Sequence, residues 1–178
     1  MIADQAMLRG YKGYYGVQNM VDEKGKPDND TGAYTNKAKT VVVNGNQLQH
    51  GVYDNDHDLG STLDHEEGHK NENIPQNKYT FVNHANVYLE QSKASDFSNT
   101  SKNNKYSVAT GFVVRTYNAY LNKEISFDDL KSNVANFNKF NTKNGVQIKS
   151  EFDGNGVDIQ VGKKPYCVSL VHLKNPQD

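Results

Sequence analysis

The sequence predicts an α+β fold, with helices in the middle of the chain and short strands toward both ends. Residues 40–43 are β-branched and precede Asn44-Gly45, a pair typical of a tight turn. In the middle, apolar residues recur at spacings of three and four, as on one face of a helix. Toward the end, residues 146–152 and 157–161 alternate between apolar and polar, which predicts a hairpin or meander. Strands and helices are thus segregated along the chain, as in α+β proteins.

Length and charge restrict the class of protein. The chain has 178 residues, which suits a single domain spanning residues 1–178. Its net charge is −1 and only two of its 20 basic residues are arginines, so we expect no nucleic-acid partner. No apolar stretch is long enough to predict a membrane segment. The first residues lack the basic and long apolar regions of a signal peptide, so the chain is either cytosolic or a piece of a larger protein.

The first half of the chain is expected to be poor in regular structure. Residues 8–37 are rich in Gly, Tyr, Asn and Asp and predict loops with room for one hairpin. Residues 51–60 predict an acidic loop. The first helix is predicted to begin at Ser61, capped with Asp64, and to run to about Asn73 before Pro75.

Three more helices and the last strand follow. Helices are predicted over 79–91, 108–121 and 127–140, the last of them capped by Ser126. The last strand is predicted over 166–173, with Cys167 buried on it as an inert thiol.

The segment His65-Glu66-Glu67-Gly68-His69 contains an HExxH motif. On a helix, residues four apart lie on one face, so His65 and His69 can offer imidazole nitrogens to one metal ion. Glu66 is placed to act as the general base toward a metal-bound water. The motif therefore predicts a Zn²⁺ site with hydrolytic chemistry.

This motif resembles the defining helix of the zincin metallopeptidases. Thr62 and Gly68 fit the wider zincin pattern, whereas Glu67, Lys70 and Asn71 depart from it. These departures indicate a helix more exposed than usual or a divergent family. The resemblance implies a zincin-like fold and a zinc-dependent peptidase that hydrolyses peptide bonds through a metal-bound water.

The third metal ligand is open between two main residues. His84 shares a predicted helix face with Phe81 and Tyr88, so it is expected to point inward, and it is favoured. Glu90 lies 21 residues after the second motif histidine, close to the spacing of one zincin branch, but on a mostly polar face. Asp96 is a remote third option.

Supporting groups are expected around the metal. Carboxylates that could accept the second N–H of the histidine rings are Asp56, Asp58 and Asp64. Candidates to stabilise the oxyanion are Tyr106, Tyr117, Tyr120 and His172.

Three other interpretations of these residues remain. Residues 54–58 invite a calcium loop; the positions where an EF-hand needs Gly and Glu hold Leu59 and His65, which excludes an EF-hand but not a looser calcium site. An HNH-type nuclease would use Asp64-His65 with Asn83-His84 downstream, but it needs a β-hairpin at the first histidine. A non-enzymatic metal-binding module would close the site with both His84 and Glu90.

In size and layout the chain resembles the toxic C-terminal domains of bacterial polymorphic toxins, including those that follow RHS repeats. That resemblance implies delivery into a target cell as part of a larger bacterial protein, a protein or peptide substrate, and a cognate immunity or inhibitor protein. Secretion or delivery is therefore favoured over a cytoplasmic location, and a free-standing bacterial peptidase is the alternative. The strand at residues 40–43 is a candidate edge on which a substrate could add as a further strand.

Overall fold

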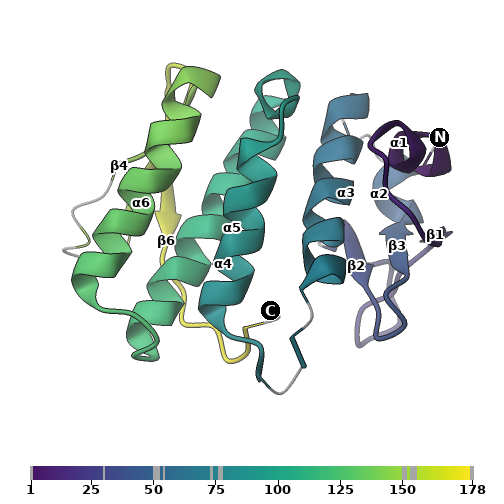
Figure 1. The fold of residues 1–178 in the computed structure, drawn as a ribbon, viewed down its shortest axis with the longest axis horizontal. Helices are drawn as coiled ribbons and strands as arrows, with labels where there is room; N and C mark the ends of the chain where they lie inside the picture. Colours follow the sequence, from purple (N-terminus) through teal and green to yellow (C-terminus); the bar gives the residue numbers. More distant parts are fainter. Residues whose placement is uncertain are drawn as a thin grey trace. The chain divides into compact units, whose positions relative to one another are not determined.

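The computed structural model describes residues 2–29, 31–49, 53, 55–72, 74–75, 78–149, 152 and 156–176. The chain divides into two compact units, here called the N-terminal unit (Met1–Asn73) and the C-terminal unit (Ile74–Asp178). Each contains helices and a three-stranded sheet, so the predicted α+β class is confirmed (Figure 1). The two units are described in turn.

The N-terminal unit is built on a small mixed sheet. Its elements are α1 (Ile2–Leu8), β1 (Tyr15–Gln18), β2 (Ala33–Thr35), β3 (Val41–Asn44), α2 (Gly45–Gln49) and α3 (Asp56–Asn71). The strand order is β1-β3-β2, with β1 parallel and β2 antiparallel to β3. The prediction of loops over residues 8–37 is therefore wrong at β1 and β2, and α1 was not predicted. The parallel pairing of β1 with β3 joins residues that are distant in the sequence, so no local sequence pattern predicts it.

The strand predicted at residues 40–43 is present as β3, but it is not an edge. It lies between β1 and β2, and its Val41 and Val43 side chains are fully buried. The tight turn predicted at Asn44-Gly45 is also wrong, because α2 begins there. The Asn44 side chain instead accepts the N–H of Asn46 at 3.1 Å, as a helix cap does, and donates to the carbonyl of Thr31 at 2.8 Å.

Helix α3 begins earlier than predicted. Its N-cap is Asn55, whose side chain accepts the N–H of Asp58, while Ser61 is buried inside the helix. The early start is favoured because Leu59 then lies one turn before Leu63, and both pack in the core of the unit. The acidic-loop prediction is thus wrong from residue 56 onward. The predicted end at Asn73 lies outside the described residues, and the described helix ends at residue 71.

The C-terminal unit packs three helices and an antiparallel meander around one core. Its elements are α4 (Phe81–Lys93), η2 (Phe97–Asn99), α5 (Lys102–Leu121), α6 (Phe127–Asn141), η3 (Thr142–Asn144), β4 (Val146–Lys149), β5 (Gly156–Val161) and β6 (Lys164–Ser169). Figure 1 shows α4, α5 and α6 side by side, and each of the three helices contacts the other two. The three helices, the Ser126 cap and the C-terminal meander are confirmed, although α5 begins at Lys102. The connection expected between the predicted strands at residues 146–152 and 157–161 includes residues 153–155, which lie outside the described residues.

The buried thiol predicted on the last strand is wrong. Cys167 is exposed, while its neighbours Tyr166 and Val168 turn toward the core of the C-terminal unit. Since β6 is an edge of its sheet and side chains alternate along a strand, Cys167 faces outward. The strand also ends at Ser169 and not at residue 173.

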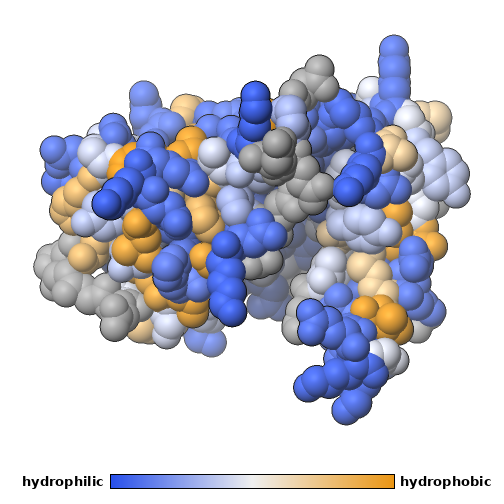
Figure 2. Space-filling model, turned by 90° about the horizontal axis from the view of Figure 1, so that it is seen from below, coloured by the Kyte–Doolittle hydropathy of each residue, from blue (hydrophilic) through white to orange (hydrophobic). Residues whose placement is uncertain are grey.

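The surface is mostly polar, as a mean hydropathy of −0.86 implies. On the face drawn in Figure 2, hydrophilic residues predominate and hydrophobic ones are interspersed among them. Among the described residues, no helix is long and apolar enough to cross a membrane.

Candidate metal centre

His65 and His69 converge on one point beside α3. Their Nε2 atoms are 3.0 Å apart, and their ring centroids are 4.7 Å apart with the planes inclined by 78°. Two imidazole nitrogens that bind a tetrahedral zinc ion at about 2.0–2.1 Å lie roughly 3.3 Å from each other. The observed pair needs to open by only a few tenths of an ångström, so these residues fit a metal ion.

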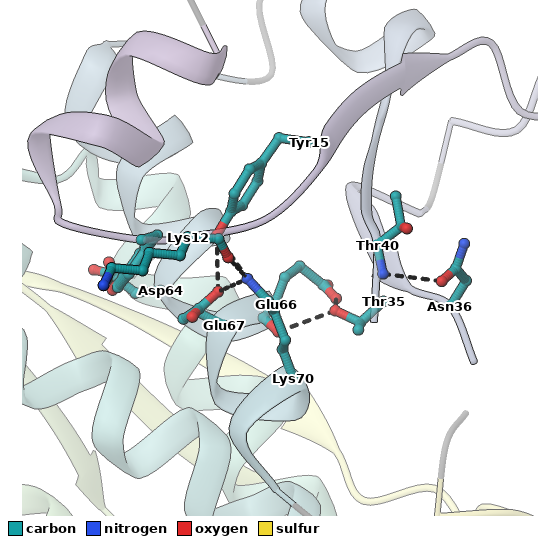
Figure 3. Close-up of polar contacts among 10 residues, drawn as sticks. Lys12, Tyr15, Thr35, Asn36, Thr40, Asp64, Glu66, Glu67 and Lys70 are labelled. Carbon is teal, nitrogen blue, oxygen red and sulfur yellow. Dashed lines mark hydrogen bonds and ion pairs between the residues drawn. The ribbon is translucent and has the colours of Figure 1, made fainter. Parts of the chain in front are cut away.

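Glu66 lies on the side of α3 that faces the sheet of the N-terminal unit. Its side chain is only 5% exposed, and the Thr35 hydroxyl on β2 donates to its Oε2 at 2.7 Å (Figure 3). Burial raises the pKa of Glu66, while the charge on His69 and the hydrogen bond from Thr35 oppose that rise. The result is a carboxylate with an increased affinity for protons, next in sequence to a candidate metal ligand. A carboxylate with a raised pKa is a better proton acceptor than an ordinary glutamate, as a general base requires.

Thr35 could not be identified from the sequence. It lies 31 residues before Glu66, on the short strand β2, within the residues for which the sequence predicts loops. Its hydroxyl also lies 3.0 Å from the main-chain carbonyl of Glu66, so it contacts both the backbone and the side chain of the proposed base.

The residues that depart from the zincin pattern form a local network. Glu67 is 9% exposed; its Oε2 accepts the Tyr15 hydroxyl at 2.8 Å and pairs with Lys70 Nζ at 3.0 Å. Lys70 also donates to the carbonyl of Lys12 (Figure 3). Burial and the Glu67 carboxylate raise the pKa of Tyr15, which keeps its hydroxyl a donor. The expectation of a more exposed helix is therefore wrong, because these charges tie α3 to the segment that leads into β1.

Asp64 holds the other end of that segment. It accepts the Tyr11 hydroxyl at 2.6 Å and pairs with Arg9 Nε at 3.1 Å. Of the other two predicted supporting carboxylates, Asp58 is buried in the first turn of α3 and Asp56 is exposed there. Their part in orienting the histidine rings stays a prediction. Residues 56–58 belong to a helix, whereas the calcium site considered at residues 54–58 needs a loop. Asp54 itself lies outside the described residues.

Glu72 is a carboxylate beside His69 that was not among the residues predicted from the sequence. Its Oε2 lies 3.6 Å from His69 Nδ1, within ion-pair range but longer than a hydrogen bond. With a metal on Nε2, the Nδ1–H of His69 would face this carboxylate, an arrangement common at histidine metal ligands. The spacing of three residues on a helix was the available signal.

The candidates for the third ligand belong to the C-terminal unit. His84 is 6% exposed, which confirms its predicted inward direction, and its Nδ1 lies 2.7 Å from the carbonyl oxygen of Pro176. The Glu90 side chain is 68% exposed and pairs with Lys93, as an ordinary solvated carboxylate does. Asp96 is half-buried at the start of η2. The structure thus distinguishes an inward histidine from an outward glutamate, and the assignment of His84 to the metal stays a prediction.

The predicted oxyanion-stabilising residues also lie in the C-terminal unit. Tyr106 packs on Tyr166, Tyr117 stacks on Phe152, and the half-buried Tyr120 lies near Phe127. His172 is exposed. Their roles remain predictions.

Comparisons of the chain with protein-family models, with curated proteins and with solved structures found no match. The interpretation of the site therefore depends on its own geometry and chemistry.

Proposed function

We propose that the chain is a zinc-dependent peptidase of the zincin type. His65 and His69 would hold the metal, with His84 as the third ligand and a water molecule completing the site. The observation that carries the proposal is the 3.0 Å separation of the two Nε2 atoms on a helix that also carries a buried glutamate next to the first histidine. Nitrogen ligands with open positions favour zinc among the common divalent ions.

In this proposal the zinc ion supplies Lewis acidity toward water and the scissile carbonyl. Glu66 accepts the proton of the attacking water and delivers it to the leaving amine. A raised pKa helps both transfers, because the carboxylate then binds and releases a proton closer to neutral pH. Thr35 holds the carboxylate in one orientation through its hydroxyl.

The antiparallel edge strand β2 is the proposed place for the substrate backbone. Because β3 is central, the edge first expected at residues 40–43 is replaced by an outer strand of the same sheet. Of the two outer strands, β2 carries Thr35, which touches Glu66. A peptide added to β2 as a further strand would run beside the proposed base.

The proposed setting follows from the resemblance in size and layout to polymorphic-toxin domains. The substrate is then a protein or peptide, an immunity or inhibitor protein is the expected partner, and delivery as part of a larger bacterial protein is favoured over a cytoplasmic location. An HNH-type nuclease is disfavoured because residues 56–71 are helical, where that fold needs a hairpin.

The experiment that tests the proposal is elemental analysis of the purified chain together with hydrolysis of a denatured protein mixture. About one zinc per chain is expected, with loss of zinc in His65→Ala and in His84→Ala. Glu90→Ala is the matched control, because its side chain is exposed, and it should keep the metal. Glu66→Gln should keep zinc and lose hydrolysis; a chain that binds zinc without Glu66-dependent hydrolysis would be a non-enzymatic module. A chain that binds no added zinc would overturn the proposal.

A further inference from the structure

The imidazole of His84 is hydrogen-bonded to a main-chain carbonyl. Its Nδ1 lies 2.7 Å from the oxygen of Pro176, 92 residues further along the chain. A carbonyl oxygen can only accept, so Nδ1 must carry the hydrogen. In the neutral ring the lone pair is then on Nε2, the nitrogen that faces away from this bond.

Packing fixes the plane of the same ring. Tyr88, one turn further along α4, stacks on His84 with centroids 5.2 Å apart and planes inclined by only 12°. The guanidinium of Arg115 lies over the Tyr88 ring, 5.3 Å from its centroid. Gly111 on α5 provides the space for Tyr88, since a Cβ at this position would lie 2.3 Å from the ring. Tyr88 is therefore confined, and His84 is confined with it.

The segment that delivers the Pro176 carbonyl is itself anchored. Asn118 on α5 is fully buried, and its side-chain amide donates to the carbonyl of Val171 at 2.9 Å. The amide oxygen of Asn118 accepts the N–H of Leu173 at 2.8 Å. The Asn118 side chain thus bonds one carbonyl and one N–H of the segment, as the backbone of a neighbouring strand would. These two bonds anchor the chain at Val171 and Leu173, a few residues before Pro176.

We propose that residues 171–176 are a positioning element for His84, anchored by Asn118, which fixes the ring in the Nδ1-protonated tautomer and makes Nε2 its metal-binding nitrogen. Metal ligands are neutral imidazoles, and a hydrogen bond from the second nitrogen holds their tautomer and orientation. The consequence for zinc rests on the proposed function. The tautomer does not rest on it and can be measured without metal.

The test uses the full chain, free of metal, at about pH 8, above the ordinary histidine pKa of about 6.5. Nitrogen-15 NMR should show a protonated Nδ1 and an unprotonated Nε2 for His84. A chain that ends after Lys174 lacks the carbonyl and should show a mixture of tautomers. Its zinc affinity, measured by competition with a chromophoric chelator, should fall by about 10- to 100-fold. Pro176→Ala keeps the carbonyl and is the matched control, expected to behave as the unaltered chain in both measurements.

A second variant provides an independent test in case the shortened chain does not fold. Insertion of two glycines after Lys174 keeps every residue but displaces the carbonyl, and it should change the tautomer in the same way. An unchanged tautomer in both variants would overturn the proposal. A changed tautomer with unaltered zinc affinity would overturn the metal-binding part of this proposal. The loss or retention of zinc in His84→Ala tests separately whether His84 is a ligand at all.

Discussion

The hydroxyl of Thr35 on β2 donates to the carboxylate of Glu66 on α3 at 2.7 Å, which joins the edge of the sheet to the helix that carries the HExxH motif. The same hydroxyl lies within 3.0 Å of the Glu66 carbonyl. A single side chain therefore fixes both the rotamer of the proposed base and the position of its backbone against the sheet.

Replacing Thr35 tests whether this contact supports catalysis. In Thr35→Val the shape is kept but the donor is lost, so we expect hydrolysis of denatured protein to fall by about 10-fold, as a misplaced base implies. Zinc content should not change, because neither histidine is touched. Thr35→Ser keeps the hydroxyl and should recover most of the activity. Equal activity in the Val and Ser variants would contradict a positioning role.

The raised pKa of Glu66 makes the stability of the N-terminal unit depend on pH. An unfolded glutamate has a pKa of about 4.3, and burial raises that of the folded group, so the folded state binds the proton more tightly. The stability contributed by protonated Glu66 is present below the unfolded pKa and is lost as pH rises through the folded pKa. Glu66→Gln cannot ionise, so it should stabilise the metal-free unit at about pH 8 by on the order of 1 kcal/mol and have little effect at about pH 4.

Urea unfolding in the presence of a chelator, at both pH values, measures this difference. Thr35→Ser is a suitable control, because it leaves the carboxylate in place. A Glu66→Gln variant that is less stable at the higher pH would show that the ionised carboxylate is well compensated in the folded unit.

Glu72 is expected to tune the metal through His69. With its Oε2 at 3.6 Å from His69 Nδ1, Glu72 is placed to accept from that nitrogen once Nε2 binds a metal ion. Glu72→Ala should weaken zinc binding by about 10-fold in chelator competition, and Glu72→Gln, which keeps an acceptor oxygen, should lose less. The exposed Glu90→Ala gives the baseline for removing a carboxylate elsewhere. If Glu72→Ala, Glu72→Gln and Glu90→Ala all bind zinc with the same affinity, Glu72 serves only as the C-cap of α3.

A substitution at Gly111 sets the helix propensity of alanine against a clash with the Tyr88 ring. Ala is worth about 1 kcal/mol more than Gly inside a helix, but a Cβ here would lie 2.3 Å from the Tyr88 ring, so the overlap decides the sign. Gly111→Ala should destabilise the C-terminal unit by about 1–3 kcal/mol. The double change Gly111→Ala with Tyr88→Leu should cost less than the two single changes together. Thermal unfolding of the four proteins provides the coupling energy, and strict additivity would contradict the proposed clash.

The parts of the fold that the sequence predicted are those determined by nearby residues. The Ser126 cap with Asp129 is contained in four residues, and the structure has it as predicted. The start of α3 was missed because Asn55 and Ser61 are both good caps. Packing of Leu59 in the core decides between them, and no local pattern contains that information.

The site divides in the same way. His65, Glu66 and His69 follow from helical spacing within five residues, whereas the contact of Thr35 with Glu66 spans 31 residues and depends on strand pairing. Glu67 and Lys70 depart from the zincin pattern, and the sequence gives no structural reason for either residue. Their partners Tyr15 and Lys12 lie more than 50 residues earlier, so their structural role was invisible from the motif.

The pairing of Asp64 with Arg9 and Tyr11 has a practical consequence for how the chain can be shortened. Trimming the first dozen residues would look harmless, because the motif begins more than 50 residues later. It would nevertheless remove the guanidinium of Arg9 and the hydroxyl of Tyr11, both of which contact the largely buried carboxylate of Asp64. Asp64 immediately precedes the first histidine of the motif. A shortened version of this protein should therefore keep the segment that contains Arg9 and Tyr11.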